Sequence, residues 1–89
     1  MVENHPARIV IVDDREENRY VLARMLGSAG YICEQVDRGT RALELAVTDP
    51  DLIILDVNLP DMSGFDICRA LKADPATSSI MASTRSRWL

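Results

Sequence analysis

The sequence predicts an α/β fold built on a parallel sheet, and three observations support this class. Short β-branched runs alternate along the 89 residues with segments whose apolar residues recur at helical spacing. Two of these runs stop abruptly at aspartates, which is typical of strands that are buried on both faces and end at a loop. A repeated strand-helix-strand order requires parallel strands joined by right-handed crossovers. We therefore expect one doubly wound sheet.

Glycine and proline mark where the expected elements end. Two glycines, Gly27 and Gly30, offer a stop for the first helix, and Pro50 and Pro75 close the next two, because a residue before proline avoids the helical region. The tail, residues 81–89, has no clear period. The expected elements are a strand at 8–12, a helix at 15–29, a strand at 31–36, a turn at 37–40, an apolar helical stripe at 42–47, a strand at 52–55, a helix ending near 73, and at most a strand stub at 80–83.

This pattern fits a flavodoxin-like doubly wound sheet that is incomplete. Such a sheet has the strand order 2-1-3-4-5, and ligands bind where strands one and three end side by side. The sequence provides the order 2-1-3 with at most a stub of strand four, and it lacks strand five and the last two helices. We expect a single truncated domain with its core at about residues 7–80 and an atypical tail at 81–89.

Three aspartates are expected to meet at the ends of strands one and three. Asp13 and Asp14 follow the first strand, and Asp56 follows the third. At a separation of roughly 5 Å each ionised pair would repel by about 3 kcal/mol at an effective dielectric of 20, so a divalent cation would relieve the site. Carboxylate oxygens suit Mg²⁺ or Mn²⁺. With metal bound, Asp56 is placed to act as a nucleophile toward a phosphoryl group.

Simpler interpretations exist for the same residues. Asp14 begins the run DREE, which approximates a helix capping box, and Asp56 taken alone is an acidic residue at a strand end. The two cysteines, Cys33 and Cys68, lie in apolar-periodic segments and are expected to be reduced core thiols. His5 stands beside a proline in a loose leader and is expected to be solvated.

Composition excludes several functions. A net charge of −4 and a pI near 4.8 argue against direct nucleic-acid binding, which needs a basic surface. The apolar runs are much shorter than the ~20 residues of a membrane span, and the N-terminus lacks the features of a signal peptide. We expect a cytoplasmic protein.

Two segments resemble the receiver domains of response regulators in two-component signalling. They are IVDD at residues 11–14 and DVNLPDMSG at residues 56–64. The resemblance implies that Asp56 accepts a phosphoryl group from a sensor histidine kinase or phosphotransfer protein. It also implies that Mg²⁺ is coordinated by Asp14, by Asp56 and by the backbone carbonyl of Asn58, while Asp13 acts mainly through a metal-bound water.

The chain departs from that family at its C-terminal end. Receiver domains use a lysine after strand five to contact the phosphoryl group, but the single lysine, Lys72, lies late in the third helix. A hydroxyl at the end of strand four should also contact phosphate, and Ser83 and Thr84 are the candidates. We expect phosphotransfer to be impaired, and we expect strand three to form an exposed apolar edge through which the chain dimerises.

Three other functions compete with phosphotransfer. The main alternative is a protein-binding fragment that keeps the receiver scaffold without being phosphorylated. An aspartate-dependent phosphohydrolase would want a second carboxylate two residues after its nucleophile, where Asn58 stands. A nucleotide site is disfavoured because the glycines at 27–30 follow a helix rather than opening one. The sequence therefore predicts a phosphoacceptor rather than an enzyme.

Overall fold

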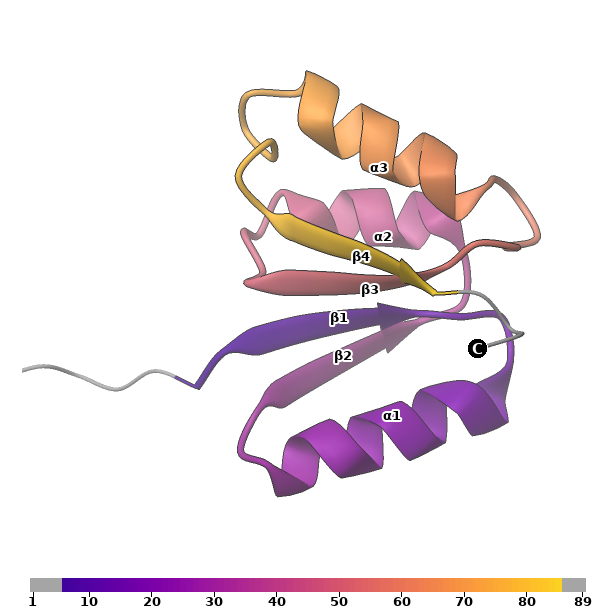
Figure 1. Ribbon diagram of the computed structural model, residues 1–89, viewed down its shortest axis with the longest axis vertical. Helices are drawn as coiled ribbons and strands as arrows, with labels where there is room; N and C mark the ends of the chain where they lie inside the picture. The colour runs from indigo at the N-terminus through magenta and orange to yellow at the C-terminus, as the bar shows by residue number, and fades with distance from the viewer. Residues whose placement is uncertain (1–5, 86–89) are drawn as a thin grey trace, which may run out of the picture.

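The computed structural model describes residues 6–85 as a four-stranded parallel sheet with three helices (Figure 1). The strand order is β2-β1-β3-β4. The predicted α/β, flavodoxin-like class is confirmed. In chain order the elements are β1 (Arg8–Val12), α1 (Glu16–Ser28), β2 (Ile32–Val36), α2 (Gly39–Ala46), β3 (Leu52–Asp56), α3 (Gly64–Ala73) and β4 (Met81–Arg85). Within residues 6–85, none of the helices combines the length and the apolar character required to span a membrane.

The main core lies between the sheet and the pair α2 and α3, whereas α1 packs apart from them against β1 and β2 (Figure 1). The β-branched runs of β1 and β3 supply its centre because both strands are interior. Ile9 and Ile11 of β1 are also buried, so this strand is covered on both faces as expected. The core residues are Val10, Val12, Val36, Ala42, Ala46, Ile53, Leu55, Ile67, Leu71 and Ile80.

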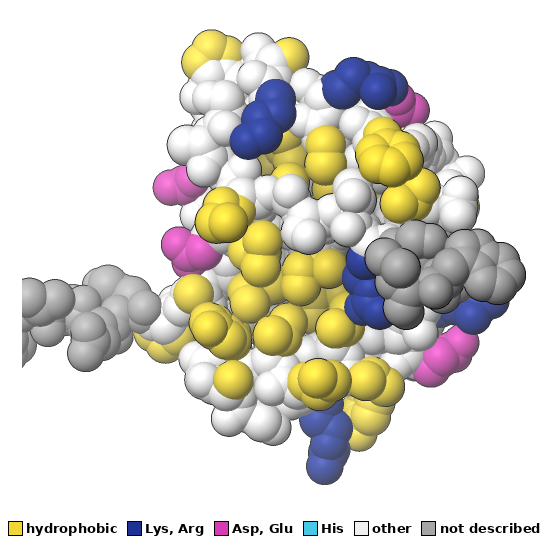
Figure 2. Space-filling view, in the orientation of Figure 1, with side chains coloured by type: hydrophobic (Ala, Val, Ile, Leu, Met, Phe, Trp, Pro, Cys, Tyr) yellow, Lys and Arg dark blue, Asp and Glu magenta, His cyan; other side chains and the backbone are white. Residues whose placement is uncertain are grey.

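The helix α1 is the least buried element. None of its residues is buried, and Tyr20, Val21 and Met25 are each more than half exposed. It ends at a glycine as expected: Gly30 has a φ of +99°, which disfavours residues with a Cβ, and its amide donates to the carbonyl of Gly27 at 3.0 Å. Figure 2 shows apolar side chains gathered on the face of the molecule turned to the viewer.

Strand four is longer than the sequence indicated. The whole of β4 pairs with β3, from Leu52 opposite Met81 to Asp56 opposite Arg85. The expectation that strand three forms an edge is therefore wrong, and within the described chain the edges are β2 and β4. The sequence understated this strand because Ser83 and Thr84 break its apolar pattern, while its pairing depends on backbone groups of β3.

The second helix also begins earlier than expected. Residues 37–40 were predicted to form a turn, but Gly39 and Thr40 already belong to α2. Their amide groups are bound by a side chain from a distant loop, which is described below. The other helix and strand boundaries lie within two residues of the sequence predictions.

Candidate metal centre

The three predicted aspartates come together at the carboxyl ends of β1 and β3. Val12 is in register with Leu55, so Asp13 and Asp56 leave the two strands at the same level. One carboxylate oxygen from each of Asp13, Asp14 and Asp56 lies within 4.8 Å of the others. Asp13 and Asp56 are only 4% exposed, whereas Asp14 is exposed. The acidic group formed by these three aspartates therefore has two buried carboxylates and one that faces solvent.

The turn into α1 holds Asp13. Its carboxylate accepts from the backbone amide of Arg15 at 2.9 Å and from the side-chain amide of Asn18 at 3.3 Å. The guanidinium of Arg19 donates to the backbone carbonyl of Asp13 at 2.7 Å. The capping residue of α1 is Arg15, so the capping box that places Asp14 at that position is wrong by one residue. Asp14 is left at the mouth of the site by this turn.

The loop after β3 holds Asp56. The Asn58 amide lies 3.4 Å from a carboxylate oxygen of Asp56, and Asn58 pairs with Ser63 in a short antiparallel bridge that closes the loop. The Gly64 amide donates to the carbonyl of Val57 at 2.9 Å. The loop therefore brings the backbone of Asn58 beside the predicted phosphoacceptor.

The same loop anchors α2, a relationship that sequence reasoning missed. The Asp61 carboxylate accepts from the amides of Gly39 at 2.8 Å and Thr40 at 2.9 Å, which are unpaired donors at the helix start. These bonds lower the pKa of Asp61. One sequence feature could have indicated this contact. The residue before α2 is Arg38, which has no side-chain acceptor to cap the helix, so the cap must come from elsewhere in the chain.

The acidic group fits a hard divalent cation. Its ligand atoms are carboxylate oxygens alone, and the cluster contains no histidine or cysteine. Mg²⁺ and Mn²⁺ prefer such donors and usually keep several waters, which the exposed side at Asp14 would accommodate. The ion would also relieve the mutual repulsion of the carboxylates.

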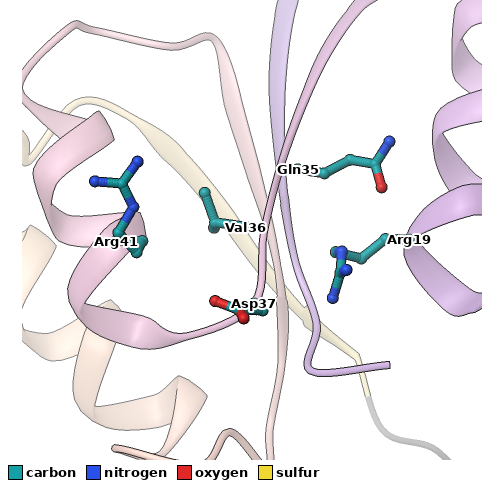
Figure 3. A pocket seen from close by; sticks show the side chains of 5 residues that line it. All are labelled: Arg19, Gln35, Val36, Asp37 and Arg41. Carbon is teal, nitrogen blue, oxygen red and sulfur yellow. The ribbon is translucent and has the colours of Figure 1, made fainter. Parts of the chain in front are cut away.

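A polar hollow of about 310 Å³ lies next to this centre, at the end of β2 (Figure 3). In Figure 3, Arg41 and Val36 lie on one side of the strand and Arg19 and Gln35 on the other. Its two cations already have partners: Arg41 pairs with Glu44 at 2.7 Å, and Arg19 binds the Asp13 carbonyl. Among the residues that line the hollow, Arg19 contacts the candidate metal centre through its hydrogen bond to the Asp13 carbonyl.

The remaining candidates lie at different depths along the sheet. Thr84 is in register with Leu55 and Ser83 with Ile54. Because successive side chains of a strand alternate between the two faces of the sheet, Ser83 is on the face of Asp56 and Thr84 is on the opposite face. Lys72 lies in the last turn of α3, 3.5 Å from the carbonyl of Ser78, whereas α3 begins next to Asp56. It is therefore at the far end of the helix from the metal centre.

The two thiols are not part of the acidic group. Cys33 and Cys68 are free and half-buried rather than fully buried, and burial raises the pKa of both thiols. His5 and residues 86–89 lie outside the described residues.

The model of the response regulator receiver domain matches residues 9–87. Response regulator PleD of Caulobacter vibrioides is 45% identical over 75 residues, which cover 83% of this chain and 16% of PleD. Transcriptional regulatory protein CusR of Escherichia coli is 40% identical over 67 residues, covering 74% of this chain and 30% of CusR. The chain therefore spans less than a third of the length of these two relatives.

Solved structures agree with this match. Chemotaxis response regulator CheY4 of Vibrio cholerae superimposes with a TM-score of 0.84 at 31% identity, covering 90% of this chain and 68% of that one. The signal receiver domain of a histidine kinase from Syntrophus aciditrophicus gives 0.83 at 38% identity, covering 88% and 60%. Sequence match, strand order and acidic pocket all agree, and the chain belongs to the response regulator receiver domain family.

Proposed function

We propose that this chain is the phosphoacceptor module of a two-component phosphorelay and that it accepts a phosphoryl group on Asp56. The observation that carries the proposal is the placement of three carboxylate oxygens within 4.8 Å at two adjacent strand ends. The donor is a sensor histidine kinase or a phosphotransfer protein. The two free thiols, which form no disulfide, fit action in the reducing cytoplasm.

Each residue has a defined role in this proposal. Asp14, Asp56 and the carbonyl of Asn58 would hold Mg²⁺, and Asp13 would act on the ion through a water. The bound ion neutralises charge on the phosphoryl oxygens. An oxygen of Asp56 forms a bond to phosphorus as the P–N bond of the donor's phosphohistidine breaks, and the leaving imidazole takes a proton. Ser83 or Thr84 contacts the transferred group, with Ser83 favoured because it shares the sheet face of Asp56.

The test is phosphorylation by a small phosphodonor. The chain is incubated with acetyl phosphate and Mg²⁺, and uptake of one phosphoryl group is followed by intact-protein mass spectrometry. We expect uptake that requires Mg²⁺ and is abolished in Asp56→Asn. Labelling that proceeds in EDTA, or that persists in Asp56→Asn, would contradict the proposal. A Thr84→Ala variant that is labelled normally would remove that residue from the contact set.

The alternative function is protein binding without phosphotransfer, and one observation favours it. Lys72 lies at the far end of α3 and cannot supply the cation that receiver domains use. Loss of a preorganised donor at a reacting group costs several kcal/mol of transition-state stabilisation. If Mg²⁺ binds but neither acetyl phosphate nor the phosphoryl mimic beryllofluoride has an effect, the scaffold alternative is the better description.

Self-association is a further part of the proposal. The strand β4 is an edge of the described sheet, Met81 on it is exposed, and an edge strand presents unpaired backbone groups to another chain. We propose that a second copy pairs at this edge. Light scattering should show a dimer that Ala82→Pro weakens, because the Ala82 amide faces away from β3 and proline removes that donor. A cooperatively melting monomer at all concentrations would overturn this part.

A further inference from the structure

The last described residue of β4 lies directly beside the proposed phosphoacceptor. Arg85 is in register with Asp56, and its carbonyl accepts from the amide of Val57 at 3.2 Å. Neighbouring strands are about 4.8 Å apart, and residues in register on parallel strands send their side chains to the same face. Arg85 is half-buried. Its long side chain therefore starts within reach of any group attached to Asp56.

Several other cations of the described chain are placed differently. Arg19 is held by the carbonyl of Asp13, and Lys72 lies at the opposite end of α3. The remaining arginines that form salt bridges, Arg8, Arg38, Arg41 and Arg69, pair with acidic residues outside the acidic group. Arg85 is thus the described cation whose strand position is level with Asp56.

We propose that the Arg85 guanidinium contacts the phosphoryl oxygens on Asp56 and supplies positive charge to them. This inference rests on the proposed phosphoacceptor function. A guanidinium presents several donors in a planar fork that matches phosphoryl oxygens, and it stays charged at all working pH values.

The proposal predicts two effects of opposite sign. A fixed positive charge beside the acidic group repels a divalent cation when no phosphoryl group is present, and it attracts a phosphoryl mimic when one is bound. Loss of the Arg85 charge should therefore weaken binding of beryllofluoride but leave Mg²⁺ binding equal or tighter. A merely structural role at the end of β4 would weaken both.

The experiment measures Mg²⁺ alone and beryllofluoride at saturating Mg²⁺ by isothermal titration calorimetry. For Arg85→Ala we expect beryllofluoride to bind at least about tenfold more weakly, because the charge-assisted hydrogen bonds to the mimic are lost. Arg85→Lys should restore most of that affinity. The control is Arg24→Ala, which removes an exposed arginine whose guanidinium donates to Tyr20 within α1.

Three results would overturn the inference. They are unchanged beryllofluoride affinity in Arg85→Ala, a parallel loss of Mg²⁺ and beryllofluoride affinity, and tighter beryllofluoride binding. In each case a normal response of the unmodified chain would leave the phosphoacceptor function standing. Failure of the unmodified chain to bind beryllofluoride with Mg²⁺ would instead refute both proposals together.

Discussion

Gly64 lies so close to Asp56 that a Cβ at residue 64 would overlap the backbone carbonyl oxygen of Asp56. It would also lie 3.2 Å from the carbonyl carbon of Asp56 and from the Cα of Val57. Glycine is required here for close backbone approach rather than for an unusual φ. This contact links the start of α3 to the position of Asp56, the proposed phosphoacceptor.

Gly64→Ala should therefore damage both stability and the metal centre. Because the obstructing atoms belong to the backbone, the loop must shift, and we expect a loss of about 1–3 kcal/mol in the free energy of unfolding. Mg²⁺ affinity should fall as Asp56 is displaced. Urea denaturation and calorimetric titration measure the two effects.

The matched control is Gly27→Ala in α1. A Cβ there meets no atom within 4 Å, and glycine inside a helix is less stable than alanine by roughly 0.5–1 kcal/mol. This variant should be neutral or slightly stabilised. Equal behaviour of the two variants would contradict the importance of the contact between Gly64 and Asp56.

Asp61→Asn should change the pH dependence of stability. The bonds from Gly39 and Thr40 lower the pKa of Asp61 from its usual 3.8. A lowered pKa in the folded state means that the ionised carboxylate stabilises the fold fully above the unfolded pKa. That contribution is lost as pH falls through the folded pKa.

We therefore expect the melting temperature of Asp61→Asn to lie below that of the unmodified chain near pH 7. The two should converge as the pH falls below about 4. The control is Glu44→Gln, which removes an exposed acid of α2 that pairs with Arg41, and exposed pairs contribute little. A constant difference between pH 7 and pH 3 would argue against the capping role.

Mg²⁺ should raise the melting temperature through the acidic group. An ion that binds the folded state stabilises it by about 2.7 kcal/mol at one hundred times its Kd. Asp14→Asn removes an exposed ligand whose loss disturbs no buried packing. We expect this variant to bind Mg²⁺ at least about tenfold more weakly, a loss of about 1.4 kcal/mol.

Without metal, the melting temperature of the same variant in EDTA is the baseline for the shift that Mg²⁺ produces. Differential scanning fluorimetry in EDTA and in Mg²⁺ separates the two effects. Undiminished stabilisation of Asp14→Asn by Mg²⁺ would exclude the proposed centre.

Arg8 should matter more for stability than its position at the start of β1 indicates. Its guanidinium donates to Glu34 at 2.7 Å and to the Thr48 carbonyl at 2.8 Å, and its amide donates to Asp51 at 2.7 Å. It thus ties β1 to β2 and to the turn that leads into β3. For Arg8→Ala we expect a loss of about 1–2 kcal/mol, reduced by partial solvent exposure.

The comparison for Arg8 is Arg41→Ala. Arg41 makes an exposed pair with Glu44 one helical turn away, with both side chains more than half exposed. Such pairs contribute less than about 0.5 kcal/mol. Chemical denaturation of both variants tests the contrast, and similar losses would show that the Arg8 network contributes nothing special.

The sequence alone determined the α/β class, the strand order and the acidic group. Runs such as Arg8–Val12 have a local signal, because a strand buried on both faces must be continuously apolar. Asp13, Asp14 and Asp56 could be joined in advance because parallel strands bring their carboxyl ends to one edge. These conclusions need only patterns that are short in sequence.

Only the tertiary structure decided the features that depend on groups far apart in the chain. Asp61 starts α2 from more than 20 residues away, Gly64 must be a glycine because of Asp56, and β4 owes its full length to β3. Arg85 faces Asp56 only once the register is set. The physical reason is the same for all of these features. Hydrogen bonds and close contacts between distant segments produce no periodic pattern that could be recognised in the sequence.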